Sequence, residues 1–172
     1  MTRIPTEAGV IAGIFLMLYG IGKIGDGQTM GRANCTGQQL VNEALRYLNR
    51  PYYLGAGQDA NHPDPPYIDC GLLTKKALAP YGITVPRTVT EQVQLAPTKI
   101  EISGKSYNEI KNLLRTGDMI GFDWNPGGRY SHTGIWTGNT VLHASSTIGK
   151  VTKSNLEHFS LGGFRTIYSF TR

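Results

Sequence analysis

The stretch SHTGIWTGNTVLHAS, residues 131–145, decides the fold class of this 172-residue chain. Two short runs rich in β-branched and aromatic residues flank the turn TGN, a pattern that is typical of a β-hairpin. Similar runs lie before and after it, DMIGFDW and FRTIYSF, and turns such as NPGG separate them. The second half of the chain therefore predicts an antiparallel meander.

The first half of the chain predicts helices instead. Three helix starts carry a capping box, in which Ser or Thr is followed three residues later by Glu or Gln: Thr36, Thr88 and Ser106. The first of these helices is expected to end near Arg50, and a further helix is expected from Cys70 to about Ala79. Helices followed by an antiparallel sheet are typical of an α+β domain and not of a parallel α/β sheet.

The N-terminus changes character near Gly25. Residues 1–24 are hydrophobic and carry no charge from Ala8 to Gly22, a run of about 22 Å as a helix, which is borderline for crossing a membrane. An uncleaved anchor, a helix buried in an assembly and a cleaved signal peptide are the three interpretations. We expect residues 4–24 to bind a membrane or a hydrophobic assembly, residues 25–34 to form a Gly-rich linker, and residues 35–172 to fold as one domain.

Composition narrows the class of protein. Hydrophobic residues make up 40% of the chain, enough for one compact domain with a core. The formal charge is +5, from 17 Lys and Arg against 12 Asp and Glu, and the basic residues are scattered. This balance suits an anionic polymer or a membrane surface as partner. The sequence lacks RNA-binding, zinc-finger and phosphate-loop motifs, so we expect no nucleic-acid partner.

The two cysteines, Cys35 and Cys70, are too few for a disulfide scaffold. A cysteine without further context is more often a small buried residue than a nucleophile. Cys70, however, begins an expected helix, where backbone N–H groups and the helix dipole stabilise a thiolate. The same N–H groups can bind the oxyanion of a tetrahedral intermediate. If Cys70 is a nucleophile, it must stay unpaired.

Two of the four histidines qualify as its base. His62 and His158 lie in polar stretches and are expected at the surface. His132 and His143 lie in the two strands of the expected hairpin, so folding can bring their imidazoles together, one as base and the other orienting it. Two strand histidines are also common as half-buried core residues. A metal site is the third interpretation, but no third ligand lies at suitable spacing, so no metal is expected.

Five blocks of the sequence, in order, resemble the NlpC/P60 family of cell-wall cysteine peptidases: RPYYLGAG, DCGLL, YGITVPRTVTEQ, TGDMIGF and SHTGIWTGNTVLHAS. The resemblance covers about Thr36 to Arg172. It implies that residues 35–172 are a catalytic domain with a papain-like α+β fold, in which N-terminal helices pack on a small antiparallel sheet or partial barrel. The hydrophobic N-terminal helix would be an addition to that fold.

The resemblance also implies roles for site residues. Cys70 would be the nucleophile, His132 the general base and His143 the orienting residue. Tyr52 would line the cleft, and Asp69 and the backbone N–H of Cys70 are further candidates for contact with the substrate or its oxyanion. The family commonly has Ser then Gly after the cysteine, whereas this chain has Gly71 then Leu72. The preferred peptide is therefore open, and the long loop QDANHPDPPYI is expected to reshape one rim of the cleft.

The expected reaction is hydrolysis of an amide bond in a peptidoglycan stem peptide through an acyl-enzyme, without a cofactor. Two alternatives remain open: a cysteine amidase or acyltransferase acting on another acyl substrate, and a catalytically silent component that binds cell wall in a membrane or virion. The expected location is the bacterial cell envelope, with the chain membrane-anchored or exported, or else a phage virion.

Overall fold

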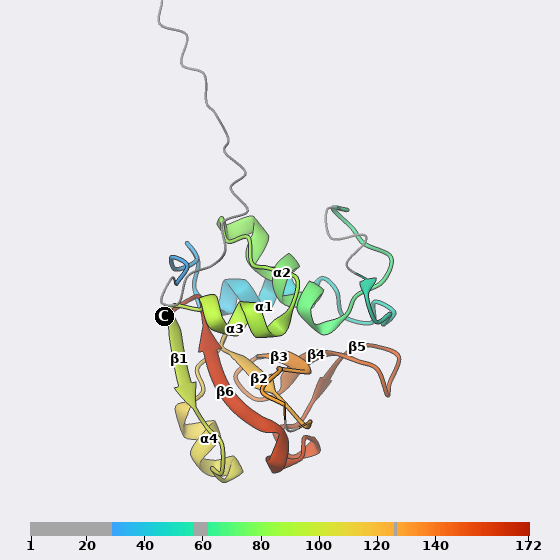
Figure 1. The fold of residues 1–172 in the computed structure, drawn as a ribbon. Coiled ribbons are helices and arrows are strands. Elements are labelled where there is room, and N and C mark those ends of the chain that lie inside the picture. The colour runs from blue at the N-terminus through green and yellow to red at the C-terminus, as the bar shows by residue number, and fades with distance from the viewer. Residues whose placement is uncertain (1–28, 57–61, 126) are drawn as a thin grey trace, which may run out of the picture.

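The structure, a computed structural model, describes residues 29–56, 62–125 and 127–172 (Figure 1). The expected hydrophobic helix of residues 1–24 and the start of the expected linker lie outside the described residues. None of the helices in the described ranges combines the length and hydropathy of a transmembrane segment. Residues 29–34 lie against the domain, since Met30 N–H donates to the Leu95 carbonyl and Ala33 N–H to the Phe170 carbonyl, each at 2.7 Å.

In the described ranges, the α-helices begin where the sequence predicts. They are α1 (Gly37–Leu45), α2 (Cys70–Leu78), α3 (Val89–Leu95) and α4 (Tyr107–Leu113). The short 3-10 helices η2 (Ala79–Tyr81), η3 (Leu156–His158) and η4 (Leu161–Gly163) were not predicted. The capping boxes at Thr36, Thr88 and Ser106 are all formed. Helix α1 ends earlier than the expected Arg50, because Asn49 turns with φ 67° and donates its N–H to the Val151 carbonyl of the sheet at 2.9 Å.

The second half of the chain forms one antiparallel sheet, as predicted. Its strands are β1 (Thr98–Glu101), β2 (Met119–Phe122), β3 (His132–Trp136), β4 (Val141–Ser145), β5 (Lys150–Ser154) and β6 (Phe164–Ser169). Their order across the sheet is β1-β6-β2-β3-β4-β5, and every neighbouring pair is antiparallel. The two edge strands, β1 and β5, were not anticipated from the sequence. The α+β fold class is confirmed.

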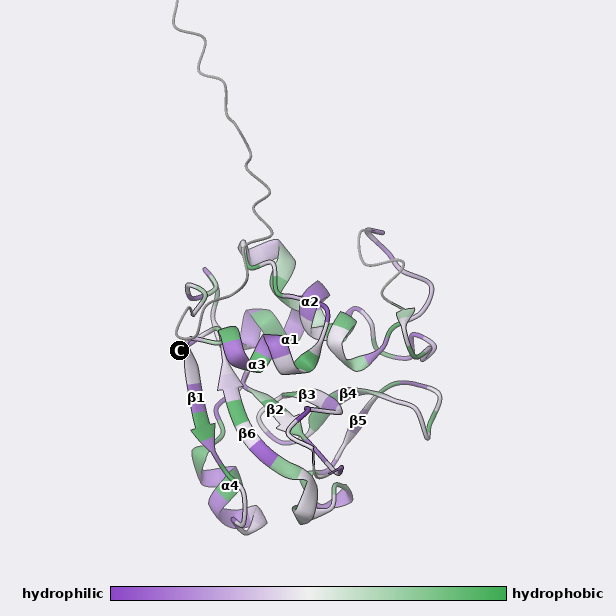
Figure 2. Ribbon diagram, viewed as in Figure 1, coloured by the Kyte–Doolittle hydropathy of each residue, from purple (hydrophilic) through white to green (hydrophobic). Residues whose placement is uncertain are grey.

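Both faces of the sheet are covered. On one face, α1 and α2 pack against strand residues such as Met119 and Leu142, and on the other, α4 and η3 cover Phe122 and Trp136 (Figure 1). Figure 2 shows hydrophilic and hydrophobic residues alternating along α1 and α4, as expected of helices with one buried face. Helix α2 contacts both β3 and β4, and this packing brings the cysteine of α2 to the strands that carry the two histidines.

Candidate functional site

Cys70 is the first residue of α2, and its helix is fixed by Asp69. The Asp69 side chain is the N-cap and accepts the Leu72 N–H at 2.9 Å, which is the bond that an aspartate at this position typically makes. The backbone N–H of Cys70 has no partner in the described part of the chain. It is therefore available to an oxyanion formed next to the sulfur.

Asp69 itself is committed to the protein. Besides Leu72, it accepts the Gly55 N–H at 3.1 Å and forms an ion pair with Arg87. Its side chain is only 4% exposed. Asp69 thus fastens three segments around the start of α2, and its carboxylate does not face an incoming ligand.

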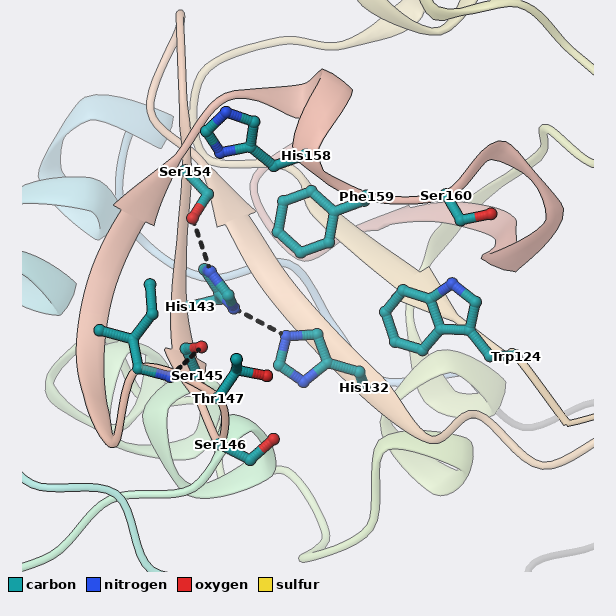
Figure 3. Close-up of a pocket in the computed structure, with 11 residues that line it drawn as sticks. Trp124, His132, His143, Ser145, Ser146, Thr147, Ser154, His158, Phe159 and Ser160 are labelled. Carbon is teal, nitrogen blue, oxygen red and sulfur yellow. Dashed lines mark hydrogen bonds between the residues drawn. The ribbon is translucent and has the colours of Figure 1, made fainter.

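The two histidines form a hydrogen-bonded chain that the serine of a third strand completes (Figure 3). His132 Nε2 lies 3.0 Å from His143 Nδ1, and His143 Nε2 lies 3.0 Å from Ser154 Oγ. The rings are nearly perpendicular, at 87°. Strands β3, β4 and β5 contribute one residue each, so the sheet register brings the chain together.

Gly134 makes room for this contact between the rings. A Cβ at position 134 would lie 3.1 Å from the His143 Cβ and 2.4 Å from Val141 Cγ1. A side chain there would push His143 away from its position, because contacts this short are not tolerated in packed interiors. The glycine of HTGIW is therefore part of the site's construction.

Burial favours the uncharged form of the Cys70 thiol and of both imidazoles. Burial, with a smaller contribution from His143, lowers the pKa of His132 to about 3, and burial lowers the pKa of His143 to about 4. Burial and the nearby Asp69 carboxylate raise the pKa of Cys70 to about 11, although the Thr133 and Gly71 N–H groups and the Arg87 charge act in the opposite direction. The resting site holds a thiol and two neutral imidazoles.

The sulfur lies at the start of β3. The backbone N–H of Thr133, the residue after His132, lowers the pKa of the Cys70 thiol. Among the described residues, no hydrogen bond joins this sulfur to the His132 ring. The sulfur and the His132 ring line different cavities. Cys70 and Ser131 line one of about 560 Å³, and His132 and Trp124 line another of about 420 Å³.

The other expected residues are distributed as follows. Tyr52 is partly buried. Its pKa is raised by burial and, to a smaller extent, by the nearby Cys70. His158 is exposed and lines the cavity of His132, whereas the exposed His62 accepts a hydrogen bond from the Asp64 N–H. Cys35 is not bonded to Cys70, and both are free thiols. No group of three potential metal ligands occurs within the described ranges.

Three contributors to the site were not found from the sequence. They are Thr133, whose N–H lowers the pKa of the Cys70 thiol, Arg87, which pairs with Asp69, and Ser154, which ends the histidine chain. Arg87 lies in the block VPRTVTEQ, so the family resemblance was a sequence signal for this residue. Ser154 had none, because its partner is determined by the pairing of β4 with β5.

The arrangement of helices on one antiparallel sheet is a papain-like α+β fold. The chain belongs to the NlpC/P60 family, whose model matches residues 49–162. It is 31% identical over 100 residues to the probable endopeptidase p60 of Listeria innocua, covering 58% of this chain and 18% of the relative. It is 29% identical over 117 residues to the bifunctional muramidase/DL-endopeptidase CwlT of Bacillus subtilis, covering 65% and 30%.

Solved structures agree on the fold. The NlpC/p60 domain of the peptidoglycan hydrolase SagA has a TM-score of 0.58 at 23% identity, covering 77% of this chain and 98% of that one. The P60 domain of the M. avium subspecies paratuberculosis antigen MAP1204 has a TM-score of 0.58 at 22% identity, covering 79% and 95%. The chain spans less than a third of the two curated relatives named above and about half of two Corynebacterium glutamicum relatives. The two structural matches confirm the expected papain-like α+β fold.

Proposed function

We propose that this protein is a cysteine peptidase that hydrolyses an amide bond in the stem peptide of peptidoglycan. One observation carries the proposal: a cysteine at a helix start, whose backbone N–H has no partner among the described residues, lies beside a strand whose histidine begins a His132–His143–Ser154 chain. The names of relatives, endopeptidase and peptidoglycan hydrolase, support the substrate class. The family resemblance favours a bond that follows a γ-D-glutamyl residue.

The hydrogen-bonded chain assigns a direction to proton transfer. Because His132 Nε2 is bonded to His143, only Nδ1 of His132 is left to accept the thiol proton. A neutral His132 then carries its proton on Nε2 and donates it to His143 Nδ1. His143 accordingly carries its proton on Nε2 and donates it to Ser154 Oγ. His143 is thus a positioning residue that sets the tautomer of the base.

The reaction begins with a thiol and an imidazole that are both uncharged. The proton moves from Cys70 to His132 as the sulfur attacks the carbonyl carbon, and the carbonyl oxygen becomes an oxyanion bound by the Cys70 N–H. The C–N bond then breaks while the His132 imidazolium gives its proton to the leaving amine. Water, deprotonated by His132, hydrolyses the thioester and releases the acid and the free thiol.

The two cavities fit the two halves of such a substrate. The acyl half stays bonded to the sulfur, so it belongs in the cavity lined by Cys70, Gly71 and Arg87. The amine half must reach the proton on His132, so it belongs in the cavity lined by His132 and Trp124. Tyr52, expected along the cleft, is not among the described residues that line either cavity, and Asp69 contributes by holding α2 and Arg87 in place.

We further propose that the protein works in the bacterial cell envelope, with residues 4–24 anchoring or exporting it, or that it is carried in a phage virion. Digestion of peptidoglycan distinguishes the proposed peptidase from a silent wall-binding component, which would release no fragments. It also distinguishes the peptidase from an amidase or acyltransferase on another acyl substrate, because the fragments released from the wall identify the bond that is cut.

The test is digestion of purified peptidoglycan by the full chain, with the fragments identified by mass spectrometry. We expect Cys70→Ala to release none, His132→Asn almost none, and His143→Asn a measurable part, because an amide can still hydrogen-bond to His132. Cys35→Ala, the matched control for loss of a thiol, should cut like the parent. Fragment release by Cys70→Ala equal to that of the parent would exclude the mechanism.

A further inference from the structure

Three hydroxyl groups are buried where α2 packs on the sheet, and the proposed reaction uses none of them. They belong to Thr74 of α2, Thr133 of β3 and Tyr168 of β6, and each of these residues is at most 1% exposed. Hydroxyls removed from water this completely are costly unless they are hydrogen-bonded. Each of the three has such a partner among the described residues.

The hydroxyls of Tyr168 and Thr133 bond to each other across an intervening strand. In the sheet, β2 lies between β6 and β3, and Tyr168 is paired with Met119 of β2. The two hydroxyl oxygens nevertheless lie 2.7 Å apart, in the buried layer between the sheet and α2. This bond therefore ties β6 directly to the residue that follows His132 on β3.

The third hydroxyl connects this pair to the residue that carries the nucleophile. Thr74 lies one helical turn after Cys70, and its hydroxyl donates to the Cys70 carbonyl at 3.3 Å. The pKa of Tyr168 is raised mainly by burial, then lowered by the Thr133 side chain, raised by Cys70 and lowered by the Thr74 side chain. Groups act on a pKa in this way only from close by. The Tyr168 hydroxyl is therefore a neighbour of both α2 and β3, and it keeps its proton near neutral pH.

We infer that Tyr168 is a positioning residue of the active site, which acts through its bond to Thr133. The bond holds the start of β3, with the His132 ring and the Thr133 N–H, in one place relative to Cys70. Without it, the Thr133 hydroxyl would be buried without a partner, and β3 would have to shift to satisfy it. This role rests on the proposed peptidase function, to which it adds a residue that aligns the base with the nucleophile.

The first test is Tyr168→Phe, which removes the hydroxyl and keeps the ring. We expect kcat of the full chain on a stem peptide to fall about tenfold or more while KM stays within about twofold, because the bond aligns the reacting groups and does not contact the substrate. Tyr81→Phe is the matched control. The Tyr81 hydroxyl also bonds a carbonyl, that of Gln39 at 3.0 Å, but lines neither described cavity, so kcat should not change. An unchanged kcat in Tyr168→Phe, or an equal loss in both variants, would overturn this role.

The second test measures alkylation of Cys70 by iodoacetamide, with peptide mapping to separate it from Cys35. Burial raises the pKa of the Cys70 thiol and the Thr133 N–H lowers it, so displacement of β3 in Tyr168→Phe should reduce the thiolate fraction. Alkylation at about pH 8 should then be about threefold slower or more. Asp69 and Arg87, the charged groups beside Cys70, are unchanged in this variant.

A variant that is merely loosened would expose the buried sulfur and react faster than the parent, which would refute the positioning role. This assay needs no peptide substrate. If the parent cuts neither stem peptides nor peptidoglycan, the proposed function fails, and the alkylation rates still decide whether Tyr168 holds β3 beside Cys70.

The third test breaks the same bond from β3, so that the role stays testable if Tyr168→Phe does not fold. Thr133→Val should lower kcat as much as Tyr168→Phe does, whereas Thr133→Ser keeps the hydroxyl and should retain most of the activity. The double variant with Tyr168→Phe and Thr133→Val should be no worse than either single variant, because both lose one shared interaction. Parent-like kcat in Thr133→Val, or losses that multiply in the double variant, would contradict a role exerted through this bond.

Discussion

Gly71→Ala tests whether Arg87 fills the space in which a side chain at position 71 would lie. The added Cβ would lie 2.6 Å from the Arg87 carbonyl oxygen, about 0.8 Å closer than the ordinary contact limit of 3.4 Å, and 3.0 Å from Arg87 Nη1. Overpacking of this kind costs roughly 1–3 kcal/mol, while alanine in a helix gains up to about 1 kcal/mol over glycine. The clash is the larger effect, so we expect a net loss of about 1–2 kcal/mol in unfolding free energy.

Thermal and urea unfolding measure this loss, with an expected fall in Tm of about 3–8 °C. Gly31→Ala is the matched control, because nothing lies within 4 Å of a Cβ at that position. Since backbone relief would displace Arg87 from the cavity, kcat/KM on a stem peptide should fall by about tenfold or more in Gly71→Ala alone. If Gly71→Ala is as stable and as active as Gly31→Ala, the reasoning about Arg87 is wrong.

Three further predictions concern the titratable groups. Burial raises the pKa of Cys70 to about 11, so its rate of alkylation by iodoacetamide, measured by peptide mapping, should be slow at pH 7 and rise about tenfold per pH unit. A fast rate that is constant below pH 7 would indicate a thiolate–imidazolium ion pair instead. Ser154→Ala should lower kcat about two- to tenfold with Tm nearly unchanged, the loss of one hydrogen bond to His143; an unchanged kcat would mean that the serine is irrelevant. Burial lowers the pKa of His143 to about 4, so the contribution of neutral His143 to stability is complete above pH 6.5 and is lost as pH falls toward 4, by about 2 kcal/mol at pH 5. His143→Asn should therefore flatten the dependence of the unfolding free energy on pH. An equally steep dependence in the variant and the parent would contradict this.

Local signals were sufficient for the helices and the inner strands. The capping boxes act within four residues, and β2, β3, β4 and β6 carry nearly continuous buried residues. The strands that were missed, β1 and β5, are the edges of the sheet. Their sequences, TKIE and KVTKS, place charged residues on the exposed side, a common means of protecting edges, and so they lack the hydrophobic pattern by which strands are found.

The site was foreseen to the extent that single residues reveal chemistry. A cysteine at a helix start and two hairpin histidines can be read along the chain, and the structure brings these elements together. The bonds of Asp69 to Arg87 and of His143 to Ser154 join segments whose neighbourhood depends on tertiary packing and strand pairing. No local pattern encodes such partners.

The position of β6 within the sheet has a consequence for how the domain folds. This strand is the last in sequence order, yet it lies inside the sheet, between β1 and β2, and antiparallel pairs join it to both. The sheet therefore cannot close until residues 164–169 have paired with β1 and β2, although the segments that carry Cys70, His132 and His143 all precede them in the chain. A chain interrupted before β6 lacks the strand that supports β2, and β2 is the strand on which the histidine strand β3 pairs.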